Sequence, residues 1–285
     1  MRTSLLLAPL AAIVLPFLVW PAVFGLLASF TSYGPFETSV RFVGLDNYAA
    51  VLGDQQFVLA FRNVAVFTIV AATAELVLGC GIAYLLREPF RGRSALRVAL
   101  LLPWLVSPVA NGVMWHFLLD RTIGLLDFLP ALVGLPAGPS PLGVSGLALP
   151  TAIATDVWRK APLVGFLVLP GLAAIPREHW ENATLEGARL AARIRHVMLP
   201  PLLPLLLTIA MLLVGDTLGT FDSILILTGG GPGSETLTPG LYAYQQAFRA
   251  NDWRIGATAG WLVAASVLLV GVAYVRLGRA LRSRG

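Results

Sequence analysis

Glu181–Pro204 reads ENATLEGARLAARIRHVMLPPLLP, a polar segment with three arginines between two strongly apolar ones. It begins with acidic residues, has a glycine at Gly187, and ends where Leu199-Pro200 opens the next apolar run. Charge inside a hydrophobic chain is costly unless it faces water. The pattern therefore predicts a short helix outside the bilayer, a bend at Gly187, and a second helix that leads back into lipid.

The composition around this segment is that of a membrane protein. Of the 285 residues, 57% are hydrophobic and 12% are charged, whereas soluble domains carry about 25% charged residues. The net charge of +5 could suggest nucleic acid, but the arginines lie at the ends of apolar runs rather than on a basic face. That pattern sets orientation in a membrane. We expect a lipid bilayer as the surroundings and no nucleic-acid partner.

Six apolar runs are long enough to cross the roughly 30 Å of hydrocarbon, which takes about 20 residues. They lie at about residues 5–30, 64–86, 98–119, 147–174, 197–218 and 255–275. The first is too long for the h-region of a cleaved signal peptide and has no clear cleavage site, so we interpret it as a retained helix. The sequence predicts one all-α transmembrane domain over residues 1–285. Its longer connections, near residues 31–62 and 120–146, are rich in Gly and Pro and are expected to be irregular.

The basic residues predict the orientation of these spans. With the N-terminus in the cytoplasm, 13 of the 20 Lys and Arg residues fall on the cytoplasmic side, as the positive-inside rule requires. Both termini and the 181–204 segment are then cytoplasmic. The 13 are Arg2, Arg87, Arg91, Arg93, Arg97, Arg177, Arg189, Arg193, Arg195, Arg276, Arg279, Arg282 and Arg284.

The usual signatures of catalysis are missing from the sequence. Lys160 is the only lysine and lies in WRKAP, so no phosphate-binding G-x-x-x-x-G-K motif exists. The GGGPG stretch, Gly229–Gly233, is interpreted as a helix-terminating loop. His116, His179 and His196 do not have the spacing of a metal site. We predict that the chain is not an enzyme and holds no cofactor.

Ionisable residues inside two predicted spans need an explanation, because charge in lipid is usually functional or paired. Glu75, in the second span, indicates either a proton or ion site or, as we favour, a buried polar link to a neighbouring helix. Asp156, Arg159 and Lys160 cluster beside Pro162, which is placed to break or kink the fourth span. Alternatively, these three charges mark an outer helix end and face water.

Two further stretches suggest a lined passage. Trp158 lies beside Pro162 and could cover the apolar face of a sugar ring, although a tryptophan at the membrane interface is equally common. The GDTLGTFDS stretch places hydrogen-bonding groups next to a glycine-containing break, at the edge of an apolar surface. We interpret it as lining a passage rather than facing lipid. The residues concerned are Asp216, Thr217, Thr220, Phe221, Asp222 and Ser223.

These motifs together resemble the permease subunit of a carbohydrate ABC importer, nearly end to end. The matching stretches are GLDNY (Gly44–Tyr48), DVWRKAP (Asp156–Pro162), GLAAIPREHWENATLEGA (Gly171–Ala188), LPPLLP (Leu199–Pro204) and FDSILILTGGGPG (Phe221–Gly233). The LTGGGP sequence is typical of the maltose-F-like and glycerol-3-phosphate-A-like member of the permease pair. The resemblance implies the type I importer fold, with six transmembrane helices and a cytoplasmic coupling helix.

The resemblance also implies partner subunits and a loop that couples this chain to the ATPase. Residues 176–196 would be the coupling loop, in which Glu181, Ala183, Glu186 and Gly187 form the coupling helix and its turn. The family framework of acid, glycine and Leu-Pro is kept, although several positions between them differ. The implied partners are a second, maltose-G-like permease, two cytoplasmic ATPase subunits that hold ATP and Mg, and an extracytoplasmic sugar-binding protein.

In maltose-type relatives the sugar site lies midway through the membrane. The resemblance carries that site over to Trp158, Arg159, Leu163, Gly219, Thr220, Phe221 and the neighbouring Asp222. We expect ATP-driven import of a sugar or sugar-like solute across the bacterial cytoplasmic membrane, with disaccharides, monosaccharides, amino sugars and glycerol phosphodiesters all left open. The alternatives are an ion-coupled secondary transporter that uses Glu75, or a membrane scaffold that transports nothing.

Overall fold

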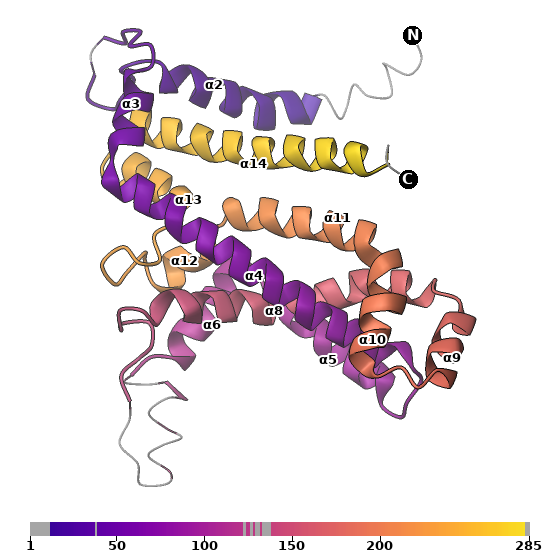
Figure 1. Ribbon diagram of the computed structural model, residues 1–285. Helices are drawn as coiled ribbons and strands as arrows, with labels where there is room; N and C mark the ends of the chain where they lie inside the picture. Colours follow the sequence, from indigo (N-terminus) through magenta and orange to yellow (C-terminus); the bar gives the residue numbers. More distant parts are fainter. Residues whose placement is uncertain are drawn as a thin grey trace.

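The computed structural model describes residues 12–37, 39–121, 124, 125, 128, 132 and 138–282, with side chains up to residue 276, and its regular elements are helices (Figure 1). In chain order they are η1 (Leu15–Val19), α2 (Trp20–Ser29), α3 (Asp46–Gly53), α4 (Gln55–Arg87), α5 (Arg93–Leu105), α6 (Pro108–Leu118), α8 (Ala148–Ala173), α9 (Arg177–Leu185), α10 (Leu190–Arg193), η2 (Ile194–Met198), α11 (Leu199–Leu218), α12 (Asp222–Leu227), α13 (Pro239–Tyr244), η3 (Gln245–Arg249) and α14 (Trp253–Arg282). The η segments are π-helical.

Four to six membrane spans fit this set of helices. Four described helices are long and apolar enough to cross a bilayer, namely Ala12–Ser29, Gln55–Arg87, Leu190–Leu218 and Trp253–Arg276. Two bent pairs, α5 with α6 and α8 with α9, bring the number to six if each pair is one span. The all-helical fold is confirmed. The helices overlap all six predicted ranges, and residues 5–11 of the first range lie outside the described residues.

The structure adds one detail to the first half of the chain and corrects one prediction there. The apolar run at residues 98–119 is divided between α5 and α6, which meet at 97° and are one span only if the bent pair crosses together. Pro108 explains the break, since a residue before proline disfavours helical dihedrals, and Ser107 caps α6 by accepting a hydrogen bond from the amide of Ala110. Residues 31–62 are not irregular throughout, because α3 and the first turns of α4 lie within them.

The fourth span also differs from its prediction. Pro162 was expected to break or kink this span, and α8 continues through both Pro162 and Pro170, so the helix is not broken there. A proline inside a helix removes one backbone hydrogen bond and strains the preceding turn. Here the surrounding packing outweighs that cost, because Pro162 is buried together with Ala161 and Val164 of α8.

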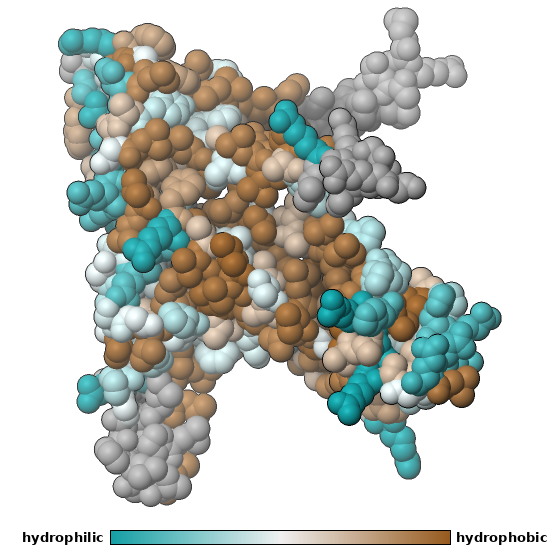
Figure 2. Space-filling view, in the orientation of Figure 1, coloured by the Kyte–Doolittle hydropathy of each residue, from teal (hydrophilic) through white to brown (hydrophobic). Residues whose placement is uncertain are grey.

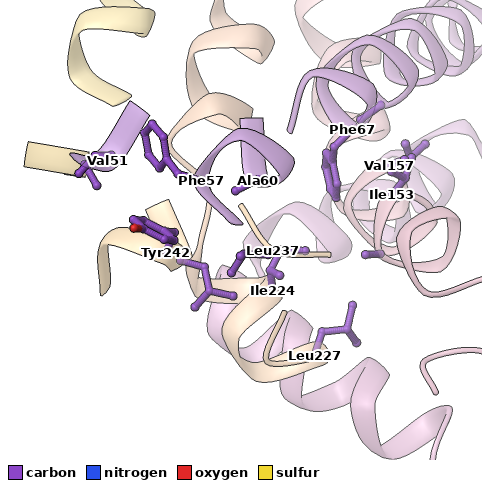
Figure 3. Close-up of a cluster of buried hydrophobic side chains, with 14 of the residues drawn as sticks. Val51, Phe57, Ala60, Phe67, Ile153, Val157, Ile224, Leu227, Leu237 and Tyr242 are labelled. Atoms are coloured by element: carbon purple, nitrogen blue, oxygen red, sulfur yellow. The ribbon is translucent and has the colours of Figure 1, made fainter. Parts of the chain in front are cut away.

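Two apolar clusters hold the helices together, and α4 packs along α8 through both of them (Figure 1). The first joins α4, α8, α12 and α13, and its members include Phe57, Phe67, Ile224 and Tyr242 (Figure 3). The second joins α4, α8 and α11 to α9 at the other end of the molecule. Burial of apolar side chains of this size contributes about 1.5–3 kcal/mol each, so these clusters fix how the long helices lie against one another.

The two ends of the helix bundle differ in what they carry (Figure 1). The α9–α10 loop lies at one end, together with the described start of the first helix and the end of α14. α3, α6 and α12 with its following loop lie toward the opposite end. Hydrophilic surface gathers at both ends, over α9 and α10 at one of them, and hydrophobic surface lies between (Figure 2). This is the surface expected of a protein that crosses a bilayer.

Candidate functional site

The 181–204 segment forms the helix, turn and second helix that its sequence predicts. α9 ends at Leu185, and Gly187 adopts a left-handed conformation with φ +69°. The amide of Ala188 donates to the carbonyl of Ala183 at 2.9 Å, and the amide of Gly187 donates to the carbonyl of Thr184 at 3.0 Å. These paired bonds are the Schellman motif, which favours glycine at this position. The chain then turns into α10 and η2 and continues as α11.

α9 is anchored to the bundle by Trp180. The indole ring is buried in the second apolar cluster, and the guanidinium carbon of Arg87, the last residue of α4, lies 3.9 Å from a ring centroid of Trp180. Tyr84 adds a tilted ring contact at 6.1 Å. On the other side of the turn, Nε of Arg193 donates to the carbonyl of Ala188 at 2.9 Å. Through Trp180, α9 thus shares one apolar cluster with α4, α8 and α11.

The predicted coupling residues divide between the two sides of this loop. Glu181, Glu186 and Gly187 are exposed, and Leu185 between them is 86% exposed. Ala183 is buried, so it packs α9 against the bundle rather than facing outward. An open cavity of about 830 Å³ lies beside α9, with Arg87, Trp180 and Glu181 among its lining residues. The outward side of α9 thus presents two acidic residues around the large apolar side chain of Leu185.

The predicted break in the fifth span is present. α11 ends at Leu218, and Gly219, Thr220 and Phe221 separate it from α12. The hydroxyl of Thr238 donates to the carbonyl of Thr220 at 3.0 Å, which supports one of the freed backbone groups. The structure also bears out the interpretation of Gly229–Gly233 as a helix-terminating loop, since Gly229, Gly230 and Gly233 all have positive φ beyond the end of α12.

The aromatic members of the predicted passage lie in two separate places. Phe221 stacks on Tyr244 with ring centroids 5.7 Å apart and lines an apolar cavity of about 430 Å³ between α2, α13 and α14. Trp158 instead makes an edge contact with Trp115 of α6, at 5.5 Å. Trp158 and Leu163 are five residues apart, so they point about 140° apart around α8. One surface of α8 therefore cannot present both.

Five ionisable side chains form a cluster between α4, α8 and α11, which we call the charge cluster. On α8, Asp156 pairs with Arg159 at 3.1 Å and with Lys160 at 2.8 Å. Nζ of Lys160 also lies 2.6 Å from Oδ2 of Asp216 on α11. Asp156 and Lys160 are buried within α8. The alternative that these charges mark an outer helix end in water is therefore wrong.

Glu75 of α4 completes the charge cluster. Its side chain is 0% exposed, and it interacts electrostatically with Lys160 and, more weakly, with Asp156, Asp216 and Arg159. Neither carboxyl oxygen has a hydrogen-bond partner among the described residues. The favoured buried polar link to a neighbouring helix is therefore electrostatic, to charged residues of α8, rather than a hydrogen bond. Glu75 adds a third carboxyl group around the single lysine.

Sequence reasoning missed two features that the structure reveals. Trp180 and Arg87 lie far apart in the chain, and nothing in either local sequence marks their contact. Lys160 and Asp216 were both recognised as polar residues in apolar runs, but their pairing across two helices was not. Opposite charges at corresponding depths in two predicted spans were the available signal.

The fold, with its projecting helix–turn–helix loop and a broken helix beside buried charges, defines a membrane permease. It superposes on the crystal structure of a bacterial ABC transporter involved in the import of the acidic polysaccharide alginate, with a TM-score of 0.82 over 98% of this chain and 95% of that one, at 20% identity. The chain belongs to the family of binding-protein-dependent transport system inner membrane components, whose model matches residues 75–284.

Two relatives illustrate the range of the family. The chain is 32% identical to the trehalose/maltose transport system permease protein MalF of Thermococcus litoralis over 278 residues, which cover 96% of this chain and 92% of the relative. It is 29% identical to the sn-glycerol-3-phosphate transport system permease protein UgpA of Agrobacterium fabrum, over 93% of this chain and 88% of the relative.

Family membership settles the class of protein. The chain is a multi-pass inner-membrane permease subunit of a binding-protein-dependent ABC importer. Such a subunit is not itself catalytic and has no cofactor, because the partner ATPase holds the ATP. The importer works as a complex with that ATPase and with a periplasmic binding protein. An ion-coupled secondary transporter and a scaffold without transport are both ruled out by this membership.

Proposed function

We propose that this chain is the maltose-F-like half of a permease heterodimer that imports a sugar or sugar-like solute. It would pair with a second, maltose-G-like permease and receive its solute from the binding protein. Relatives named for trehalose and maltose and for sn-glycerol 3-phosphate support a carbohydrate-like cargo. Because these names include both neutral and anionic compounds, the relatives leave the charge of the solute open.

The observation that carries the proposal is the α9 loop. It projects at 85° from α8, exposes Glu181, Leu185 and Glu186, and is fixed at its base by Trp180. A rigid projection with an acidic and apolar tip suits docking into a groove of an ATPase, where Leu185 would be buried and the carboxylates would meet basic groups. Closure of the ATPase pair would then move α9 as a lever on α4, α8 and α11.

The orientation follows from the same assignment. If α9 meets the cytoplasmic ATPase, the end of the bundle that carries α9, the described start of the first helix and the end of α14 faces the cytoplasm (Figure 1). Both chain termini are then cytoplasmic, in agreement with the arginine bias of the sequence. The Gly229–Gly233 loop faces the binding protein on the opposite side.

The proposal assigns some residues to coupling with the ATPase and others to the solute passage. Glu181, Ala183, Glu186 and Gly187 form the coupling element, in which Ala183 packs inward and the other three are exposed. The residues assigned to the solute passage are Trp158, Arg159, Leu163, Gly219, Thr220, Phe221 and Asp222, of which Trp158 and Leu163 would line different sides of α8. Gly219 is exposed and Thr220, Phe221 and Asp222 are partly exposed at the break between α11 and α12, where a second permease would complete the lining.

Substitutions in α9 test the coupling assignment. Gly187→Pro forces φ to about −65° where the turn has +69°, and Glu181→Lys reverses a charge at the tip. Both variants should insert into the membrane but lose the ATPase when the permease is affinity-purified from cells expressing the whole importer. Glu37→Lys, the same charge reversal in an exposed loop beyond α2, should retain it. Normal recovery of the ATPase with both α9 variants would refute the coupling assignment.

A further inference from the structure

We propose that Asp216 binds the solute directly, and that the charge cluster behind it admits solutes with hydroxyl or ammonium donors and no fixed negative charge. The proposal rests on the function proposed above and narrows its cargo. Neutral sugars and amino sugars fit, whereas phosphate- or carboxylate-bearing sugars do not.

Asp216 is held in place as a hydrogen-bond acceptor. Its Oδ2 lies 2.6 Å from Nζ of Lys160, yet 64% of the Asp216 side chain is exposed. The Lys160 side chain is only 5% exposed and is also paired with Asp156. Lys160 is thus fixed beneath the surface, and it fixes one oxygen of Asp216. Among the described residues the ion pair of Asp216 is made through Oδ2, and its side chain is largely exposed, so Oδ1 can accept a hydrogen bond from a solute.

The position of Asp216 indicates a passage rather than lipid. It lies in α11, inside the candidate span Leu190–Leu218. A carboxylate exposed on a membrane-spanning helix faces protein or a water-filled cavity, because the cost of exposing it to lipid is several kcal/mol, roughly 2.5–3.5 at the helix centre. Asp216 also lies one turn before Gly219 and Thr220, the break that the proposed passage includes.

The charge balance of the cluster decides which solutes can approach. Three acids, Glu75, Asp156 and Asp216, surround two bases, Arg159 and Lys160. With Glu75 ionised the cluster carries one net negative charge, and with Glu75 protonated it is neutral. Neither state leaves net positive charge for an anion. Both bases are already paired with Asp156.

Glu75 strengthens this conclusion independently of Asp216. It is fully buried and interacts electrostatically with Lys160, and its carboxyl oxygens have no hydrogen-bond partner among the described residues. An unpartnered buried carboxyl group adds acceptor capacity to the cluster. A phosphate, which brings about −1.5 to −2 charges at pH 7, would meet Asp216 with this second acid behind it. A hydroxyl or ammonium group would instead donate to Asp216.

The test uses the complete importer complex in detergent, trapped with a non-hydrolysable ATP analogue, and saturation-transfer NMR with trehalose, glucosamine and sn-glycerol 3-phosphate as probes. We expect transfer to trehalose or glucosamine and none to sn-glycerol 3-phosphate. Asp216→Asn should weaken the positive signal about tenfold, the effect of losing a hydrogen bond to a charged group. Asp46→Asn, an exposed acid of α3, serves as the matched control and should behave as wild type.

Asp216→Glu keeps the charge and the possibility of pairing with Lys160, so it should fold even if Asp216→Asn does not, and it should still weaken binding. Equal signals in wild type and Asp216→Glu, transfer to sn-glycerol 3-phosphate, or no transfer to any probe would overturn the inference. Uptake of the cognate solute into proteoliposomes tests the proposed function separately. An importer that takes up a sugar phosphate would refute the inference alone, and one that takes up no sugar would refute the proposed function.

Discussion

The α9 loop and the charge cluster are both polar interruptions of an apolar chain, but they are built in different ways. The turn of the α9 loop is closed by hydrogen bonds between neighbours, such as Ala188 to Ala183. The charge cluster joins three helices through Lys160, which reaches from α8 to Asp216 of α11. One site therefore depends on local backbone geometry and the other on tertiary packing. They should respond differently to mutation.

Lys160→Met should have the largest effect on stability. It leaves Asp156 buried with Arg159 as its one basic partner among the described residues and removes the ion pair of Asp216. Removing one partner of a buried ion pair costs about 3–5 kcal/mol. We expect a clearly lower Tm for the purified complex in detergent, followed by intrinsic tryptophan fluorescence.

A variant of the α9 loop provides the comparison. Glu181→Met changes an exposed side chain, so its Tm should stay close to that of wild type, within about 0.5 kcal/mol in free energy. Lys160→Met combined with Asp156→Asn should recover part of the lost stability, because the buried charge is removed as well. A wild-type Tm for Lys160→Met would mean that the ion pairs do not hold α8 to α11.

Trp180→Ala and Trp158→Ala should have different effects, because Trp180 belongs to the proposed coupling loop and Trp158 to the proposed solute passage. Trp180 is buried at the base of α9, and truncating a buried aromatic costs about 3–5 kcal/mol, here concentrated on the attachment of α9. We expect Trp180→Ala to reduce recovery of the ATPase with the purified permease. Trp158 is 39% exposed and remote from the loop, so Trp158→Ala should lower solute uptake while the ATPase is recovered normally. Loss of the ATPase from both variants would show that the two sites are not independent.

The sequence predicted the features that depend on local backbone geometry and missed those that depend on tertiary packing. The bend at Gly187 was predictable, because glycine after a helix favours a left-handed turn whatever lies around it. The helical fold and the approximate spans follow from apolar runs of sufficient length. The 97° bend at Ser107-Pro108 was also present in the local sequence and was overlooked.

The rest depended on packing that a single sequence does not contain. The continuity of α8 through Pro162 is a case in which burial outweighs a local preference. The contact of Trp180 with Arg87 and the pairing of Lys160 with Asp216 join residues that only the folded arrangement brings together. The separation of Trp158 from Phe221 likewise depends on which neighbour each ring packs against, Trp115 or Tyr244.

Gly187→Ala isolates the backbone contribution to the α9 loop. A Cβ at Gly187 would meet open space, so only the positive φ opposes it, at roughly 1–2 kcal/mol for a left-handed residue. Gly81 of α4 also has open space but no positive φ, and alanine there should stabilise the helix by about 0.5–1 kcal/mol. Coupled ATPase activity should fall for Gly187→Ala and persist for Gly81→Ala. Equal activities would mean that the turn tolerates another conformation.

The smallest expected effect is the loss of the hydrogen bonds of Glu235 at low pH. Glu235 lies at the end of the molecule opposite α9. Its carboxylate accepts hydrogen bonds from the hydroxyl of Ser145 and from the amide of Gly146, the latter at 2.8 Å. The Ser145 bond first, and then the Gly146 bond, hold the pKa of Glu235 below its usual value. Because the folded pKa is lowered, the stabilisation is complete above the unfolded pKa of about 4.3 and is lost as pH falls through the folded value.

Hydrogen exchange at the Gly146 amide, corrected for intrinsic rates, should lose protection in that acid range in wild type. Glu235→Gln should remove this pH dependence, and unchanged protection of the wild-type amide down to pH values well below the usual glutamate pKa would show that the loop is held by other contacts.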